Sequence, residues 1–181
     1  MCCPYNLGQC TGEASFFLLK TVHISATLPL RGDSMDHELY MRRALALAAE
    51  AEKDGDVPVG CVIVRDGEII GEGRNRREAD NDATAHAEME AIRMASKKTG
   101  SWRLHGCTRY VTLEPCPMCA GGIINTRIDA VRYAAREEKM GCCGSVLNLF
   151  EERFNHHPRI YRGPLVEECE HQLRDFFQKL R

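Results

Sequence analysis

The sequence has no run of about 18 apolar residues, the length that a membrane-spanning helix needs, so no transmembrane segment is expected. A secretory signal is also missing, because the apolar stretch 16–19 is too short for its hydrophobic region and no basic segment precedes it. Positive charge is not in excess either. The formal net charge of −2 argues against indiscriminate polyanion binding. A nucleic-acid partner would therefore need a local basic surface.

Cysteine, in contrast, is abundant, with ten residues in a chain of 181. The adjacent pairs Cys2–Cys3 and Cys142–Cys143 suit a disulfide framework poorly, and two other cysteines form a Cys-x-x-Cys motif. Together with the missing signal segment, this usage favours a reducing compartment in which cysteines are free or bound to metal. We therefore expect a cytoplasmic protein.

The length of the chain suits one compact domain with its own core. Residues 1–34 show no clear period and scattered turn formers, so we interpret them as a disordered N-terminal extension or as a wrongly assigned start. Residues 35–181 are expected to form a single domain. In that domain helical and strand patterns alternate, which predicts an α/β protein with helices on both faces of a mixed sheet.

The hydrophobic periodicity places the elements along the chain. The turn signal Asp66-Gly67 predicts a hairpin between the first two strands. The last helix is expected to pack Phe176 and Phe177 on the core. Helices are expected over residues 35–54, 84–99, 116–127, 146–154 and 164–181, and strands over 59–64, 68–73, 108–113, 130–135 and 159–163.

Two short stretches, "TAHAEMEAIRMA" at 84–95 and "EPCPMCAGGI" at 114–123, carry the residues for metal chemistry. Each is read as the start of a helix, where side chains lean toward the N-terminus and can reach a group beyond the helix end. His86, Cys116 and Cys119 are ligands of the types that zinc prefers, and three protein ligands are typical of a catalytic site. Two helix N-termini directed at one place would favour thiolate over thiol.

Glu88 distinguishes this pattern from a structural zinc site. A carboxylate two residues from a ligand, and not needed as one, is placed to handle protons on water at the metal. A lone Cys-x-x-Cys also occurs in redox motifs and zinc knuckles, and a lone Glu88 would be an ordinary helix residue. The combination His-Ala-Glu, then 26 residues, then Pro-Cys-x-x-Cys favours a zinc enzyme.

This pattern resembles the zinc-dependent cytidine and nucleobase deaminase superfamily, whose signature is His-x-Glu followed by Pro-Cys-x-x-Cys. The stretches "VPVGCVIV", "TAHAEMEAIR", "YVTLEPCPMCAGGIINTRI" and "NLFEERFNHH" resemble its bacterial tRNA-specific adenosine deaminase branch, over about residues 36–181. The resemblance implies a three-layer α/β/α cytidine-deaminase-like fold with a central five-stranded mixed sheet. It also implies a homodimer with one Zn²⁺ per subunit.

The resemblance further implies hydrolytic deamination of adenosine to inosine at the wobble position of a tRNA, in its most specific form an arginine tRNA. His86, Cys116 and Cys119 would bind the zinc, and Glu88 would shuttle protons for a zinc-activated water. Asn75 and the backbone near Ala87 would orient the base. An anticodon loop presents splayed bases, so extruding one costs less than it would from a duplex.

Local charge agrees modestly with an RNA partner. Residues 127–162 hold seven Lys or Arg against five Asp or Glu. The candidate contacts for the tRNA anticodon loop in this stretch are Arg136, Lys139, Arg153, Asn155, His156 and Arg159.

Two other functions remain open from the sequence. A zinc deaminase of a free base or nucleoside, cytidine or guanine, would share the metal chemistry, and the acidic overall charge mildly favours a small substrate. A zinc-stabilised RNA-binding subunit without catalysis belongs to another class, and Glu88 argues against it. Activity on mononucleotides would separate the first alternative from an RNA enzyme.

Overall fold

Residues 33–180 are described by the structure, a computed structural model. They belong to the second of the two units into which the chain divides, Met1–Arg31 and Gly32–Arg181. Residues 1–32, and with them almost all of the segment expected to be an extension or a wrongly assigned start, lie outside the described residues. The second unit begins with a helix at Asp33, and its organisation is described below.

The elements alternate as the sequence pattern predicts. The helix expected over 146–154 shrinks to a single 3₁₀ turn, because the Asn148 side chain accepts a hydrogen bond from Phe150 N–H and competes with a regular helix. The helices are α1 (Asp33–Lys53), α2 (Ala87–Thr99), α3 (Pro117–Thr126), η1 (Leu149–Glu151) and α4 (Val166–Lys179). The strands are β1 (Gly60–Arg65), β2 (Glu68–Arg74), β3 (Cys107–Leu113), β4 (Ala130–Ala135) and β5 (Arg159–Arg162).

The five strands form one mixed sheet in the order β2-β1-β3-β4-β5, which confirms the predicted architecture. β1 pairs antiparallel with both β2 and β3, whereas β3–β4 and β4–β5 are parallel. The turn between β1 and β2 has positive φ at Asp66 and Gly67, as the Asp-Gly signal predicts for a two-residue hairpin.

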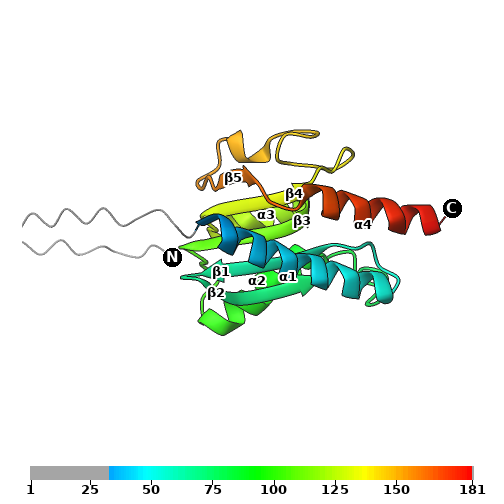
Figure 1. The fold of residues 1–181 in the computed structure, drawn as a ribbon. Helices are drawn as coiled ribbons and strands as arrows, with labels where there is room; N and C mark the ends of the chain where they lie inside the picture. Colours follow the sequence, from blue (N-terminus) through cyan, green and yellow to red (C-terminus); the bar gives the residue numbers. More distant parts are fainter. Residues whose placement is uncertain (1–32, 181) are drawn as a thin grey trace, which may run out of the picture. The chain divides into compact units, whose positions relative to one another are not determined.

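Helices cover both faces of this sheet (Figure 1). On one face α1 and α4 pack against strand residues such as Val62 and Tyr110. On the other face the apolar sides of α2 and α3 pack against Ile63, Val111 and Val131. Residues 62 and 63 contribute to opposite clusters because successive strand side chains point to opposite faces. Both faces are therefore buried, as the continuous apolar run in β1 predicts.

The strand directions determine where a site can form. β2 and β3 run in the same sense, since each is antiparallel to β1, and β4 continues that sense. The carboxyl ends of these three strands therefore meet at one edge of the sheet. That is the edge at which open α/β sheets bind ligands.

Within residues 33–180, none of the helices combines the length and hydrophobicity that a membrane span requires.

Candidate active site

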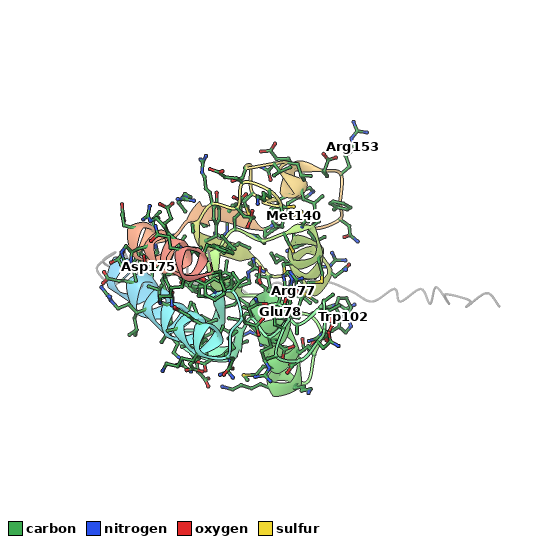
Figure 2. All side chains as sticks on the ribbon, turned by 90° about the vertical axis from the view of Figure 1, so that its right-hand side faces the viewer. Arg77, Glu78, Trp102, Met140, Arg153 and Asp175 are labelled. Atoms are coloured by element: carbon green, nitrogen blue, oxygen red, sulfur yellow. The ribbon has the colours of Figure 1, made fainter. Side chains whose placement is uncertain are left out.

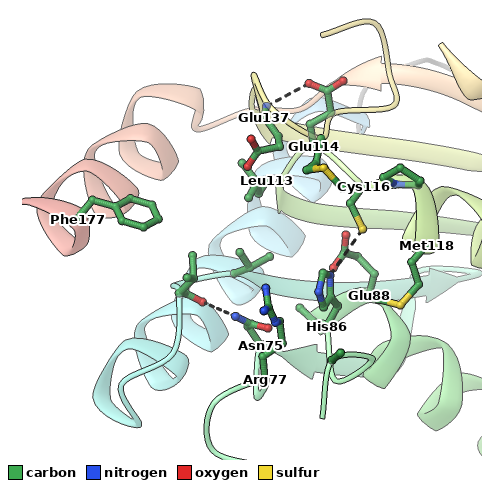
Figure 3. A pocket seen from close by; sticks show the side chains of 16 residues that line it. Asn75, Arg77, His86, Glu88, Leu113, Glu114, Cys116, Met118, Glu137 and Phe177 are labelled. Atoms are coloured by element: carbon green, nitrogen blue, oxygen red, sulfur yellow. Dashed lines mark hydrogen bonds between the residues drawn. The ribbon is translucent and has the colours of Figure 1, made fainter. Parts of the chain in front are cut away.

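His86, Cys116 and Cys119 meet where α2 and α3 begin (Figure 3). His86 and Cys116 are the N-cap residues of the two helices, and Cys119 lies in the first turn of α3. Pro117 follows Cys116 at a position where proline fits a helix start, because no intrahelical donor is lost there. The His86 Nδ1 atom lies 3.7 Å from Cys116 Sγ and 3.5 Å from Cys119 Sγ. The convergence predicted from the sequence is thus present.

The close approach of α2 to the sheet positions His86. A Cβ atom at Gly73 would lie 2.1 Å from the Ala87 carbonyl oxygen, and one at Gly71 would lie 2.4 Å from that of Ala91. Glycine at these two β2 positions lets the helix backbone lie directly on the strand. The start of α2, and the ligand that caps it, is therefore held at the carboxyl end of β2.

The donor set fits a zinc ion. One candidate ligand atom from each of the three residues lies within 4.8 Å of the others, and no further His, Cys, Asp or Glu of the described residues belongs to this group. The hydrogen bond with Cys119 and the neighbouring His86 lower the pKa of Cys116 to about 4 despite its partial burial. The same hydrogen bond and burial raise the pKa of Cys119. One nitrogen and two sulfur ligands are the composition of a catalytic zinc site.

A cavity of about 560 Å³ opens beside the three ligands (Figure 3). Glu88, with 4% of its surface exposed, lines it next to His86. Asn75 is buried, and its side-chain amide donates to the Val57 carbonyl oxygen at 3.3 Å, which fixes the carboxamide at the wall. The lining residues are Val57, Val59, Asn75, Arg77, Ala83, His86, Ala87, Glu88, Leu113, Glu114, Cys116, Pro117, Met118, Glu137, Met140 and Phe177.

Of the residues predicted to bind zinc or catalyse, His86, Glu88 and Cys116 line this cavity, and so do Asn75 and Ala87. Cys119 is buried behind the lining, within 4.8 Å of the other two ligand atoms. The predicted tRNA contacts do not line it. Arg136 and Lys139 are exposed. They lie on either side of Glu137 in the chain, and Glu137 does line the cavity. Arg153 and Arg159 are also exposed, and Figure 2 shows Arg153 well away from Arg77 and Met140.

Two of the predicted RNA contacts form hydrogen bonds inside the protein. The Asn155 carboxamide oxygen accepts from Arg127 Nη1 at 2.6 Å, and His156 Nε2 lies 2.7 Å from the Ile128 carbonyl oxygen. Both bonds connect the segment after η1 to the end of α3. A contact between either side chain and RNA stays a prediction.

Phe177 and Arg77 are among the lining residues that were not predicted as site residues. Phe176 is buried as expected, but Phe177 has 49% of its surface exposed and lines the cavity, so its expected place in the core is wrong. Phe177 follows Phe176 by about 100° on the helix, which turns it away from the core. Arg77 also lines the cavity and could have been found, since it lies two residues after Asn75 in the same loop.

Comparisons with known proteins agree with this site. The family model of the cytidine and deoxycytidylate deaminase zinc-binding region matches residues 34–135. The tRNA-specific adenosine deaminase of Bacillus subtilis is 50% identical over 145 residues, which are 80% of this chain and 90% of that protein. The stretch matched by the family model contains His86, Glu88, Cys116 and Cys119.

Solved structures show the same relationship. A structure from studies of A-to-I editing by tRNA:A34 deaminases at the wobble position superposes with a TM-score of 0.73 at 40% identity, covering 75% of this chain and 99% of that one. The guanine deaminase of Bacillus subtilis gives a TM-score of 0.54 at 38% identity, covering 80% and 93%. With its zinc-type ligand set, its buried glutamate and these relatives, the chain belongs to the cytidine and deoxycytidylate deaminase family and, within it, to the tRNA-specific adenosine deaminases.

Proposed function

We propose that this protein converts adenosine to inosine by hydrolysis at the wobble position of tRNA. The observation that carries the proposal is the convergence of His86, Cys116 and Cys119 beside the buried Glu88 in a cavity large enough for a base. The relatedness to tRNA-specific adenosine deaminases supplies the substrate class. Among tRNAs we propose an arginine tRNA as substrate.

When bound, the zinc ion supplies a Lewis acid that lowers the pKa of water. Glu88 accepts a proton from the attacking water and delivers protons to the purine ring and to the leaving amino group. The oxygen of water forms a bond to C6, the C6–N6 bond breaks, and ammonia leaves. The burial of Glu88 keeps bulk water away from this proton transfer.

Two groups that the protein already holds in place can recognise the base. The Asn75 carboxamide is fixed by Val57, and its backbone N–H donates to the Val59 carbonyl oxygen at 2.9 Å. Ala87 is the first residue of α2, where backbone N–H groups lack intrahelical partners and can donate to a ligand. Both residues can therefore bind the edge of an extruded base.

The rim of the cavity suits a single-stranded nucleic acid. Phe177 is half-exposed, and its ring can stack on an unpaired base. Arg77, which also lines the cavity, can bind a phosphate. Arg136 and Lys139 extend this positive surface next to the rim, and Arg153, Asn155, His156 and Arg159 are proposed as contacts farther from it.

A homodimer is the proposed state, with α3 at its centre. Exposed apolar side chains lie on segments that contact this helix: Trp102, Leu147 and Phe154. Their segments are tied to α3 by hydrogen bonds from Leu104 to Thr126 and from Arg127 to Asn155, and by the packing of η1. Burying such side chains favours association. Sedimentation velocity should give the mass of two chains, and a single-chain mass would contradict the dimer.

We also propose a cytoplasmic location, where tRNA is available.

A second candidate function has an observation of its own. The relative that deaminates guanine is 38% identical, and the cavity could hold a free base. The test is to incubate zinc-loaded protein with an arginine tRNA transcript and, separately, with free adenosine, cytidine and guanine. Inosine in the tRNA alone supports the proposal. Turnover of a free base or nucleoside alone would replace it with the second candidate, and no turnover by zinc-bound protein would favour a non-catalytic subunit.

A further inference from the structure

Two carboxylates near the cavity take no part in the proposed chemistry. Asp56 has no exposed surface and Glu114 has 2% exposed. Burying a carboxylate is costly unless it is paired or hydrogen-bonded. Neither forms an ion pair with a described cation within 4.0 Å, so backbone and hydroxyl donors must satisfy them.

Asp56 binds the loop that follows β2. Its Oδ1 atom accepts from Glu78 N–H at 2.9 Å and its Oδ2 atom from Ala79 N–H at 3.1 Å. Residues 77–81 form a single turn, whose first N–H groups have no partner within the turn itself. Asp56 supplies the acceptors from another segment. It thereby fixes the residue just before Glu78, the cavity-lining Arg77.

Glu114 binds the loop that follows β4. Its Oε1 atom accepts from Cys143 N–H at 2.7 Å and from Ser145 N–H at 3.2 Å. Its Oε2 atom accepts from Glu137 N–H at 3.2 Å and from the Ser145 hydroxyl. A Cβ atom at Gly141 would lie 2.6 Å from the Glu114 carboxyl carbon, so the loop is wrapped closely around this group. The hydrogen bond from its backbone N–H to Glu114 thus holds Glu137, which lines the cavity, in place.

The two carboxylates hold opposite walls of one cavity. Figure 3 shows Arg77 on one side of it and Glu137 on the other. Both wall segments are loops, which without such bonds would be the least stable backbone around the site. His86, Glu88 and the two cysteines lie instead at the starts of α2 and α3. The loops reach these helix starts through backbone hydrogen bonds, from Arg76 N–H to the Ala85 carbonyl oxygen and from Cys142 N–H to that of Pro115, both at 2.9 Å.

We infer that Asp56 and Glu114 are positioning residues that fix the two walls of the cavity mouth, Asp56 through Arg77 and Glu114 through Glu137. The two residues affect substrate binding, and they do not take part in the proton transfer at Glu88. The inference rests on the proposed function for its kinetic consequence. Its structural consequence, the protection of five named backbone N–H groups, is independent of any substrate.

The test uses the zinc-loaded full chain with Asp56→Asn, Glu114→Gln and a matched control for each. The control for Asp56→Asn is Asp54→Asn, two residues away, which alters an exposed carboxylate that pairs with Arg74. The control for Glu114→Gln is Glu167→Gln, which alters an exposed carboxylate at the start of α4. Hydrogen exchange is expected to become at least about tenfold faster at Glu78 and Ala79 in the first variant only, since a hydrogen bond to a charged group is lost. In Glu114→Gln, the backbone N–H groups of residues 137, 143 and 145 should exchange faster.

With tRNA as substrate, KM should rise at least about tenfold in both variants. The value of kcat should change less than about threefold and zinc content should stay the same, because the catalytic helices are untouched. Unchanged exchange at the named groups, or a fall in kcat with KM unchanged, would overturn the inference. If the wild-type chain makes no inosine, the proposed function fails, and the exchange result alone decides the positioning role.

A milder pair of variants guards against misfolding. Ser145→Ala removes one donor to Glu114, and Ser145→Thr keeps a hydroxyl at that position. The alanine variant should raise KM and speed exchange in residues 137–145, and the threonine variant should restore both. Equal values in the two variants would contradict the role of Glu114.

Discussion

Glu88 is a buried carboxylate beside three soft metal ligands, and its position favours proton transfer over a structural role. Replacing it with glutamine preserves shape and removes the ability to accept a proton. We expect Glu88→Gln to lower kcat by about 10²–10⁴-fold, the usual contribution of a general acid–base group. Zinc content, measured by atomic emission, should remain one per chain. Retained turnover would remove Glu88 from the mechanism.

Arg109 is a fully buried residue that belongs to no motif of the sequence. It lies on β3 opposite Ile63 and Val131, and within residues 33–180 none of its three guanidinium nitrogens has a hydrogen-bond partner. A buried charge without partners opposes folding.

We expect Arg109→Met to raise the free energy of unfolding by about 1–4 kcal/mol, because a flexible apolar chain of similar length replaces the charge. Urea unfolding measures the difference, with Arg103→Met as control, since Arg103 is exposed and lies over the Trp102 ring. A loss of stability in Arg109→Met would mean that the guanidinium has a partner, such as an internal water.

At the scale of elements, the contact between α2 and β2 holds the histidine ligand in place. A Cβ atom at Gly73 would meet the Ala87 carbonyl oxygen at 2.1 Å, and backbone cannot move aside as a side chain can. We expect Gly73→Ala to cost about 3 kcal/mol of stability or more and to weaken zinc binding, because α2 must shift. Chelator competition and thermal unfolding measure the two effects.

Gly121 in α3 provides the control, since a Cβ atom there meets nothing within 4 Å in the chain. Gly121→Ala should be neutral or stabilising by up to about 1 kcal/mol, as alanine favours helix. If both alanine variants behaved alike, the close approach of α2 to β2 would not be what positions His86.

The element pattern was largely predictable from the sequence, and the exceptions have local causes. α2 begins at Ala87 and not near Thr84, because Asp82 accepts from both the backbone and the hydroxyl of Thr84 and forms a turn of its own. The zinc ligands followed from their residue types, their places at two helix starts, their spacing and the resemblance to the deaminase superfamily. Glu114 and Phe177 did not, because only the tertiary fold shows that their side chains reach the cavity.

At the scale of the whole molecule, Glu114 makes the free energy of unfolding depend on pH. Burial raises the pKa of Glu114, but hydrogen bonds from Ser145, Cys143 and Glu137 outweigh it, so the pKa lies below its ordinary value of 4.5. A depressed folded-state pKa gives stability that is present above the ordinary value and is lost as pH falls through the folded value.

We therefore expect the free energy of unfolding to fall as the pH drops from 7 to below 4.5. Glu114→Gln, which cannot titrate, should be less stable at pH 7 and should lose less over that range. Urea titrations with a chelator present exclude any contribution from metal release. Parallel pH profiles of the two proteins would show that Glu114 does not carry this dependence.

The central claim is that a zinc-dependent, Glu88-driven site acts on one adenosine of a tRNA. The most direct test is position-resolved detection of inosine in a full-length arginine tRNA after reaction with the wild-type chain and with Glu88→Gln. We expect the wild type to convert the wobble adenosine alone, and the variant to convert none. Inosine at other adenosines to the same extent, or equal conversion by Glu88→Gln, would contradict it.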